Sequence, residues 1–268
     1  EKHLQELGAE VHRIPAEKGR DNIVATIGTS SKYICFYGHM DTVPPDSLWS
    51  HDPYRVTTNK GNAHGLGVAD MKGGIATILK TAEYASKHGL PIKFAFGVDV
   101  ENISLGSYIL AQSDFFDDVT AVISAESGQI YDENQDFSVN YGRKGRFVLE
   151  MEIRGKKAHA ARADAAVNAI IETAHCVRVL HNIKFPRHPQ LGELEIIPYA
   201  VNSETDSFSI PDRAVLKLNI LTVPGMTSRH VVSRIQKELK KQKILAAVQI
   251  PSRPTPYMEA YEVNVQDP

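Results

Sequence analysis

The stretch 73-GGIATILKTAEYASKHGLPIKFAFGV-98 joins two hydrophobic patterns of different period. From Ile75 to Ala85 apolar residues recur at helical spacing, and Gly89 and Pro91 end that pattern. The run IKFAFGV that follows is short and mostly apolar, as in a buried strand. The stretch therefore predicts a helix followed by a strand, which is the repeating unit of an α/β sheet.

Three more short apolar runs flank this stretch in the first half of the chain, 22-NIVATIG-28, 33-YICFYG-38 and 120-TAVISAE-126. Their alternation with a helical pattern predicts an α/β fold built around a mainly parallel sheet. Acidic or histidine-bearing segments follow three of the predicted strands. In open α/β sheets this edge, outside the carboxyl ends of the strands, is where binding and catalytic sites form.

From about residue 144 the order of elements changes to strand, helix, strand, strand, helix, strand. The segments are 147-FVLEMEI-153, a helix over 164–180 with Asp164 as its cap, 193-ELEIIPY-199, 214-AVLKLNI-220, a helix over 229–241 and 244-ILAAVQI-250. This order is typical of a ferredoxin-like module. Pro-rich 251-PSRPTPYMEAYEV-263 then resumes extended chain, so we expect one domain of residues 1–143 and 251–268 with a second domain, 144–250, inserted into it.

The composition indicates a globular protein with no global electric field. The chain has 268 residues, of which 42% are hydrophobic and 23% charged, and its net charge is -2. This excludes a strong general attraction to nucleic acid or anionic lipid, so neither is expected as a partner. Cys35 and Cys176 lie in apolar periodic segments and are expected to be buried thiols, which suits a reducing, cytoplasmic compartment.

The first candidate site motif is 37-YGHMDTVP-44, which follows a predicted strand. In extended chain His39 and Asp41 point to the same face, so Asp41 can accept the ring N–H of His39 and raise its basicity as a metal ligand. A solvated turn is the alternative interpretation of such a pair.

Three acidic residues follow at other strand or helix boundaries. Asp70 stands in the glycine-rich turn 64-HGLGVADMKGG-74, where it can also simply cap the next helix. Glu101 and Glu126 follow the third and fourth predicted strands, where isolated acids are commonly surface residues. Together with His39 they form a nitrogen and oxygen ligand set suited to zinc, manganese or cobalt at one sheet edge. If Asp70 bridges two ions, the site is of the two-metal kind that hydrolyses amides or esters.

These motifs resemble those of the M20 metallopeptidase family, the group that includes acetylornithine deacetylase, succinyl-diaminopimelate desuccinylase and glutamate carboxypeptidase. The matching segments are 38-GHMDTVP-44, 65-GLGVADMKGG-74, 99-DVENISLG-106, 124-SAES-127 and 155-GKKAHAARADAAVNAI-170. They occur in the order and spacing of the family and flank an inserted ferredoxin-like domain, as in the family.

The resemblance implies a role for each candidate residue. The implied ligands of two divalent ions, zinc with cobalt or manganese as alternatives, are His39, Asp70, Glu101 and Glu126. Asp70 is implied to bridge the ions and Asp41 to orient His39. Residues 144–250 are implied to be a lid that also forms a homodimer, from which His159 reaches the partner subunit's site and polarises the scissile carbonyl. From the residues alone, His159 is a solvated loop histidine.

The chain departs from the family pattern where the general base is expected. The family usually has two adjacent glutamates after the third strand, a general base and then a metal ligand, and alignment through Ser104 and Gly106 puts Val100 at the first position and Glu101 at the second. Valine has no proton acceptor, and the loss of a general base typically costs about 10²–10⁴ in rate. Asp99, on the same face as Glu101 in extended chain, is a candidate substitute base. Alternatively, Val100 simply replaces a glutamate.

Other departures concern the substrate and the chain ends. Leu221 falls nearest to a family arginine that binds the substrate carboxylate, and Phe208 nearest to a substrate-contacting asparagine, for which Asn202 is an alternative. The resemblance also implies a longer N-terminal helix and a C-terminal segment with a further histidine ligand. We therefore expect the sequence to be truncated at both ends relative to the family.

Three functions remain open at this level. The leading prediction is a metal-dependent hydrolase that cleaves an amide bond of an N-acyl amino acid or small peptide through a metal-bridging water. Val100, Leu221 and the expected C-terminal truncation motivate the alternative, a non-catalytic metal- or amino-acid-binding dimer derived from such an enzyme. The third is a purely structural α/β domain.

Overall fold

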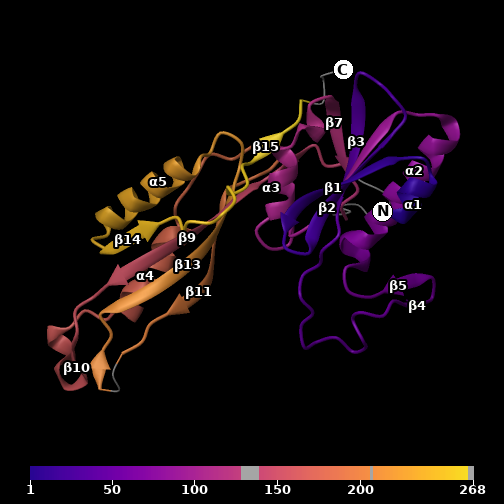
Figure 1. Cartoon of the computed structure of the whole chain (residues 1–268). Helices are drawn as coiled ribbons and strands as arrows, with labels where there is room; N and C mark the ends of the chain where they lie inside the picture. The colour runs from indigo at the N-terminus through magenta and orange to yellow at the C-terminus, as the bar shows by residue number, and fades with distance from the viewer. Residues whose placement is uncertain (128–138, 206–207, 265–268) are drawn as a thin grey trace. The chain divides into compact units, whose positions relative to one another are not determined.

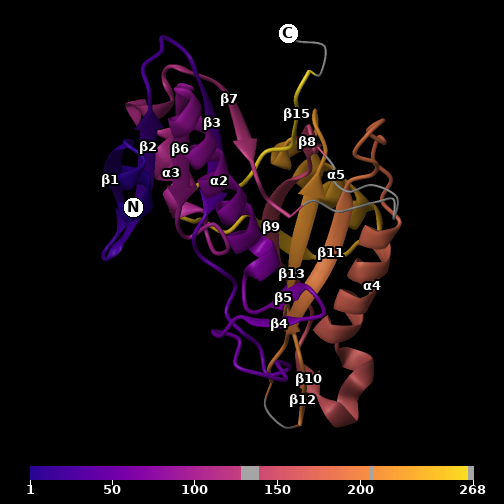
Figure 2. The ribbon, with the colours of Figure 1, turned by 90° about the vertical axis from the view of Figure 1, so that its right-hand side faces the viewer.

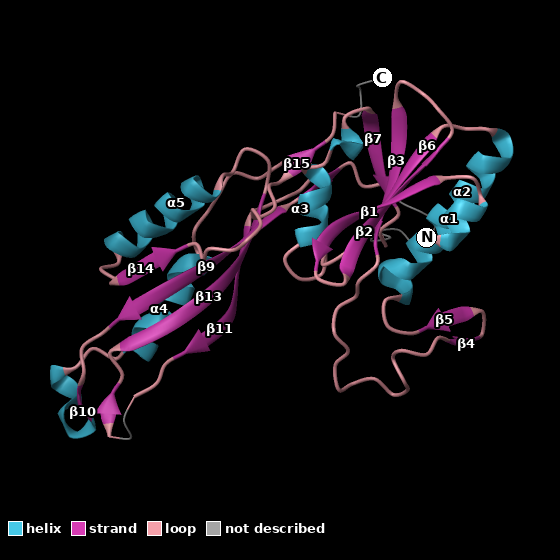
Figure 3. Ribbon diagram, viewed as in Figure 1, coloured by secondary structure: helices cyan, strands magenta, loops and turns pink. Residues whose placement is uncertain are grey.

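The computed structural model describes residues 1–127, 139–205 and 208–264. The chain divides into two compact units, Glu1–Ser138 and Val139–Pro268. Figures 1 and 2 show both units from perpendicular directions, and Figure 3 separates their helices from their strands. Each unit has a sheet and a hydrophobic core of its own.

The first unit is built on a five-stranded sheet of order β1-β2-β6-β3-β7. The strands are β1 (Glu10–Glu17), β2 (Arg20–Ile27), β3 (Tyr33–His39), β6 (Ile92–Gly97) and β7 (Val119–Ser124). The pairs β3 with β6 and β3 with β7 are parallel, whereas β1 with β2 and β2 with β6 are antiparallel. The α/β class is confirmed, but the sheet is mixed rather than mainly parallel. A short turn joins β1 to β2, and such a connection allows only an antiparallel pair.

Helix α2 (Gly73–His88) covers this sheet and ends before Gly89, as the sequence predicts. Its buried residues Ile78, Ala82 and Ala85 pack in one cluster with Phe94 and Phe96 of β6. The remaining elements of the unit are α1 (Lys2–Glu6), the hairpin β4 (Thr57–Asn59) and β5 (Asn62–His64), the turn η1 (Val68–Lys72), α3 (Leu105–Ala111) and the turn η2 (Asp114–Phe116).

The second unit has the predicted β-α-β-β-α-β order and a four-stranded antiparallel sheet, β11-β13-β9-β14. Its elements are β9 (Gly145–Arg154), α4 (Ala169–His181), β11 (Glu195–Asn202), β13 (Arg213–Thr222), α5 (Ser228–Lys241) and β14 (Ala246–Gln249). Alternate residues of β9 and β13 are buried, and they pack in one cluster with α4 and α5. Both helices therefore cover the same face of the sheet.

Helix α4 begins later than the sequence pattern predicts, and Asp164 is not its cap. Residues Ala160–Ala165 form a separate short turn, η3, and Val167 then pairs with Lys156. The cap is Asn168, whose side chain accepts a hydrogen bond from the N–H of Ile170. Both Asp164 and Asn168 are suitable caps by type, and the pairing of Val167 decides between them.

Two short ribbons complete the second unit. β10 (Ala158–His159) pairs with β12 (Ser209–Ile210), and β8 (Gly142–Arg143) pairs with β15 (Tyr261–Glu262). The second ribbon joins the segment after β14 to the chain just before β9, and both fall in the unit Val139–Pro268. The predicted division into 1–143 with 251–268 and 144–250 stays a prediction. Across the described residues, no helix has the length and apolar character needed to cross a membrane.

Candidate metal centre

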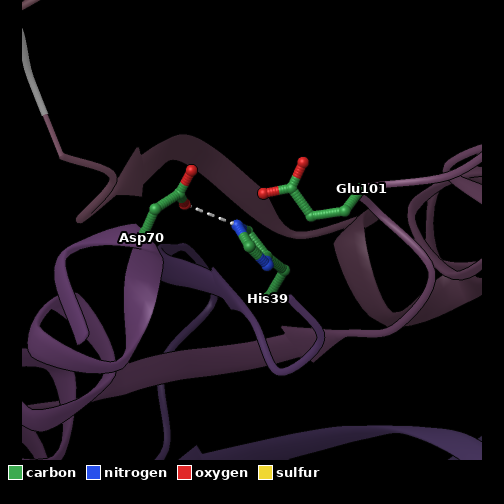
Figure 4. A group of neighbouring side chains, drawn as sticks. All are labelled: His39, Asp70 and Glu101. Atoms are coloured by element: carbon green, nitrogen blue, oxygen red, sulfur yellow. Dashed lines mark hydrogen bonds and ion pairs between the residues drawn. The ribbon is translucent and has the colours of Figure 1, made fainter. Parts of the chain in front are cut away.

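The carboxyl ends of three neighbouring parallel strands carry the candidate ligands of the first unit. His39 is the last residue of β3, Glu101 follows β6 and Glu126 follows β7, while Asp70 lies in the turn η1 before α2. Because β6, β3 and β7 are adjacent and parallel, their carboxyl ends meet at one edge of the sheet. Figure 4 shows the side chains of His39, Asp70 and Glu101 pointing toward one another.

The distances in this group suit one cluster of ligands. One ligand atom each of His39, Asp70 and Glu101 lies within 4.8 Å of the other two. His39 Nε2 is 3.0 Å from Asp70 Oδ1 and 3.7 Å from Glu126 Oε1. The His39 side chain is only 2% exposed, whereas those of Asp70 and Glu126 are 49% and 44% exposed. The imidazole thus forms the buried side of the cluster and the carboxylates its open side.

A close packing of main chains positions Asp70. Lys72 Nζ donates a hydrogen bond of 2.7 Å to the carbonyl of Leu66, which fixes the turn η1. At Gly74, a Cβ would lie 2.0 Å from the carbonyl oxygen of Ala125, so only glycine lets α2 begin directly against the segment that carries Glu126. No side-chain hydrogen bond caps α2. The alternative role of Asp70 as a helix cap is therefore not observed.

Asp41 is bonded differently from the sequence expectation. His39 Nδ1 lies 3.0 Å from the main-chain oxygen of Asp41 and 3.6 Å from its carboxylate Oδ1, so the ring N–H is donated to the main chain. The other carboxylate oxygen, Oδ2, accepts a 3.0 Å hydrogen bond from the N–H of Glu101. Residues 40–46 are not a strand, which removes the extended geometry assumed for the pair. Asp41 therefore holds His39 through its main-chain oxygen and Glu101 through its carboxylate.

The charges of the cluster shift its pKa values. Burial tends to lower the pKa of His39, but Glu126, Asp70 and Asp41 around the ring raise it overall. Burial raises the pKa of Glu101, and the charge of Asp70 acts in the same direction. Burial also raises the pKa of Glu126, against the opposing effect of His39. The carboxylates thus crowd one another, and a cation between them would relieve this repulsion.

The hypothesis that Asp99 substitutes for the general base assumed extended chain, and the structure contradicts that assumption. Residues 98–103 form bends and turns, and Asp99 has a positive φ of 61°. Its Oδ1 accepts a hydrogen bond from Asn102 Nδ2 and its Oδ2 one from the N–H of Leu105, and Arg20 lies 3.6 Å from Oδ1. Burial opposes but does not outweigh these contacts, so the pKa of Asp99 is lowered. Asp99 thus serves the local loop, and the half-buried Val100 precedes Glu101 without a base.

The remaining predicted site residues lie in the second unit. His159 is exposed in β10, and its Nδ1 accepts a hydrogen bond of 3.2 Å from the N–H of Ala161. Phe208 is 73% exposed next to this ribbon, and its carbonyl accepts the N–H of Ala160. Leu221 is in β13, where it pairs with Glu195 and Arg146.

One residue near the cluster was missed by sequence reasoning. Asn22 of β2 is completely buried and is hydrogen-bonded to both ends of the segment that carries Glu101. It stands at the start of the run 22-NIVATIG-28, where a polar residue at a strand end looks like an ordinary surface residue. Only the three-dimensional pairing of β2 with β6 reveals its position.

The donor set fits a divalent cation. Imidazole nitrogen and carboxylate oxygen are the ligands that zinc, cobalt and manganese take in proteins. The carboxylates of Asp41, Asp70, Glu101 and Glu126 give the cluster an excess of negative charge over one imidazole. In addition, Asp41 Oδ1 is buried without a hydrogen-bond partner among the described residues. Such an excess is compensated when a cation binds.

Curated relatives of this chain include succinyl-diaminopimelate desuccinylases of several bacteria. A succinyl-diaminopimelate desuccinylase of Rhodopseudomonas palustris is 28% identical over 269 residues, covering 91% of this chain and 65% of that protein. One of Nitrobacter hamburgensis is 30% identical over 201 residues, covering 67% of this chain and 50% of that protein. The chain thus spans less than two thirds of the length of these relatives.

Solved structures share the fold. A protein of Bacillus subtilis, described as a dinuclear metal binding peptidase from the M20 family, has a TM-score of 0.64 at 14% identity and covers 98% of this chain and 68% of that one. The catalytic and inserted domains of such peptidases correspond to the α/β class and the β-α-β-β-α-β unit found here. The family model described as peptidase family M20/M25/M40 matches residues 35–256, a range that includes all four clustered ligand candidates, and the chain therefore belongs to this family.

Proposed function

We propose that the protein is a metal-dependent hydrolase that cleaves an amide bond of an N-acyl amino acid or a small peptide. The convergence of His39, Asp70 and Glu101, with Glu126 3.7 Å from the imidazole, is the observation that carries the proposal. Family membership supports the same reaction class. The relatives are named for the removal of a succinyl group from an amino acid, which suggests the kind of substrate.

In this proposal His39, Asp70, Glu101 and Glu126 would hold divalent metal, and Asp70 would be the carboxylate that the family resemblance implies as the shared ligand. Bound metal supplies a Lewis acid that polarises a carbonyl and makes water more acidic. His39 keeps a fixed ring orientation, because the main-chain oxygen of Asp41 accepts its Nδ1 proton and leaves Nε2 to face the carboxylates. Asp41 also fixes the main chain of Glu101. The carboxylates of Asp70 and Glu126 are about half exposed, which leaves the centre open to a ligand.

We propose that His159 reaches the metal centre of the partner subunit in a homodimer, where it stabilises the negative charge that develops on the substrate oxygen. Its Nδ1 accepts the N–H of Ala161, so the neutral ring carries its proton on Nε2. That nitrogen can donate a hydrogen bond to an oxyanion. His159→Gln is expected to lower turnover more than metal affinity, since the residue is not one of the proposed ligands.

Metal titration of the full chain tests the metal centre. We expect the wild type to bind Co²⁺ or Zn²⁺, and His39→Ala and Asp70→Asn to weaken binding by at least about tenfold, because each loses a ligand. Glu83→Gln is the matched control, since Glu83 is an acidic residue on the exposed face of α2, paired with Lys80. A wild type that retains no divalent metal after dialysis, or equal affinities in all four proteins, would overturn the proposal.

Val100 favours a second candidate function, a non-catalytic protein that binds metal or an amino acid. The residue before Glu101 has no proton acceptor, and the carboxylate of Asp99 is engaged within its own loop. Such a site could bind divalent metal while proton transfer from water is slow. Turnover of a panel of N-acyl amino acids by the chain as it stands would eliminate this candidate. Metal binding without turnover would favour it.

We also propose that the second unit forms a homodimer. Strand β11 is at the edge of its sheet and exposes Ile197, Tyr199 and Val201, and α4 exposes Ile170 and Ile171. An exposed apolar strand edge tends to pair with another chain. Sedimentation at micromolar concentration should give a dimer, which Ile171→Glu or Tyr199→Glu should weaken. Leu245→Glu, at another exposed apolar position of the unit, should leave it intact. A monomeric wild type would contradict the proposal.

A further inference from the structure

Glu101 is carried by a closed loop of residues 98–106, which we name the ligand loop. Its ends meet, because the N–H of Gly106 donates to the carbonyl of Val98 at 3.2 Å. Inside the loop, the N–H of Ser104 donates to the carbonyl of Asp99 at 2.7 Å. The loop is thus a unit closed by its own hydrogen bonds, and its attachment to the sheet decides where Glu101 lies.

Asn22 attaches this loop to β2. Its Oδ1 accepts the N–H of Val98 and its Nδ2 donates to the carbonyl of Gly106, both at 3.1 Å. The side chain is completely buried, so both bonds are shielded from water. Asn22 is 76 and 84 residues away from its two partners in the sequence. The amide therefore joins the two ends of the loop to a different strand.

The joint leaves no room for a side chain at Gly106. A Cβ there would lie 2.3 Å from the carbonyl oxygen of Val98 and 2.5 Å from Asn22 Oδ1. Asn22, Val98 and Gly106 can make these contacts together only with glycine at the third position. The far side of the loop is held separately, by the bond from the N–H of Glu101 to Asp41 Oδ2. The loop is thus fixed at its base and at Glu101 itself.

We propose that Asn22 is a positioning residue for the metal centre: by holding the base of the ligand loop, it places the Glu101 carboxylate beside His39 and Asp70 and so sets the affinity for divalent metal. This inference rests on the proposed function, because it requires that Glu101 is a ligand. Asn22 itself does not touch the metal or the substrate. Its effect passes through the geometry of the loop.

The test is a Co²⁺ titration of the full chain, followed by visible absorption. Asn22→Leu keeps the size of the side chain and removes both hydrogen bonds, and we expect it to weaken Co²⁺ binding about 10–100-fold and to change the absorption band, as losses of groups that support ligands do. Asn22→Asp keeps the oxygen that accepts the N–H of Val98, so its Co²⁺ affinity should lie between those of the wild type and Asn22→Leu. Gly106→Ala disrupts the same contacts by placing a methyl group against Val98 and Asn22. Its Co²⁺ affinity should match that of Asn22→Leu, so the test remains valid if one of the two variants fails to fold.

The matched control is Ile27→Ala. Ile27 lies in the same strand, is buried, and pairs with Ile92 at the end of β6 remote from the ligand loop. It should lose stability without losing Co²⁺ affinity. Amide hydrogen exchange of the metal-free proteins provides a second readout. The ligand loop should exchange faster in Asn22→Leu than in Ile27→Ala, while the amides of α2 should be equally protected in the two variants.

The outcomes separate the two proposals. If the wild type binds Co²⁺ and Asn22→Leu binds it within about twofold with the same spectrum, the role of Asn22 is wrong and the metal centre stands. If Ile27→Ala loses as much affinity as Asn22→Leu, the effect is one of general stability and the inference is equally overturned. If the wild type binds no Co²⁺, the proposed function itself fails.

Discussion

Val100 is the residue on which the chemistry of the centre depends most. It precedes Glu101 in the ligand loop, is half-buried, and has only methyl groups where a proton acceptor is expected in the family. Its carbonyl accepts the hydroxyl of Ser104, so its main chain takes part in the fold of the loop. A substitution at this position therefore changes the side chain presented beside Glu101 without removing a hydrogen bond.

Val100→Glu should increase hydrolysis of N-acyl amino acids by about 10²–10⁴-fold, the usual contribution of a positioned general base. Metal affinity should stay within a few-fold, because the candidate ligands are unchanged. The control is Val100→Gln, which has the same shape without the carboxylate. Steady-state turnover and a Co²⁺ titration of all three proteins give the result. Equal rates for the Glu and Gln variants would mean that position 100 is not the place of the base.

At this scale the sequence predicts which residues meet but not how each is bonded. His39, Glu101 and Glu126 were recognisable because each follows a short apolar run, and strand ends of a parallel sheet converge. The hydrogen bonds of Asp41 and Asp99 were not predictable in the same way. The prediction for each residue assumed an extended chain, whereas both residues lie outside the strands. The positive φ angles of Asp99 and Ser104 leave no mark in the hydrophobic pattern.

At the scale of elements, α2 illustrates a prediction that needs little tertiary information. Its apolar spacing and the glycine after His88 define its extent, and both were confirmed. Helix α4 is the opposite case, since its start depends on the pairing of Val167 with Lys156, a contact that local sequence does not encode. Element ends are therefore least predictable where a loop pairs with another segment.

The start of α2 gives a stability prediction. Gly74→Ala should destabilise the first unit by a net amount of up to about 2 kcal/mol. Its methyl group would meet the carbonyl oxygen of Ala125, and the overpacking cost of about 1–3 kcal/mol is offset only in part by the gain of about 1 kcal/mol in helix propensity. At Gly73 the nearest atom is the carbonyl oxygen of Val68, 3.1 Å away, so Gly73→Ala should be close to neutral. Urea unfolding of both variants measures the difference. A stabilised Gly74→Ala would show that the contact is not tight.

For the whole molecule, the pattern of runs predicts the class and the order of elements, whereas the direction of strand pairing in the first unit required the structure. A run such as 22-NIVATIG-28 is equally suited to a parallel or an antiparallel neighbour. What decides is the length of the connection between strands, and a turn of two residues between Glu17 and Arg20 forces β1 and β2 into a hairpin.

The two thiols report on the two units separately. Cys35 is buried in the first unit and Cys176 in the second, and burial raises the pKa of each to about 12 from an ordinary value of 9.0. Both thiols should resist alkylation at neutral pH until the unit that contains them unfolds. In the unfolded chain they ionise near pH 9 while the folded protein keeps them neutral. Stability should thus be intact below that pH and fall as the pH rises toward 12.

The predicted loss between pH 8 and pH 10.5 is about 2 kcal/mol for each thiol. Urea unfolding at both pH values measures this loss. In Cys176→Ala the decrease in stability of the second unit between these pH values should disappear, and in Cys35→Ala that of the first unit should disappear. If removal of a thiol leaves the pH dependence unchanged, its environment is more polar than the structure indicates.

The bond from His39 Nδ1 to the main-chain oxygen of Asp41 has a consequence for how the centre tolerates genetic change. Every amino acid has that oxygen, so no point mutation at position 41 deletes the tether of the imidazole. The carboxylate at the same position, which holds the main chain of Glu101, is lost with almost any substitution. Substitution of Asp41 would therefore keep the hydrogen bond that orients His39 and remove the one that holds the main chain of Glu101. Mutations that accumulate at this position should displace Glu101 before they affect His39.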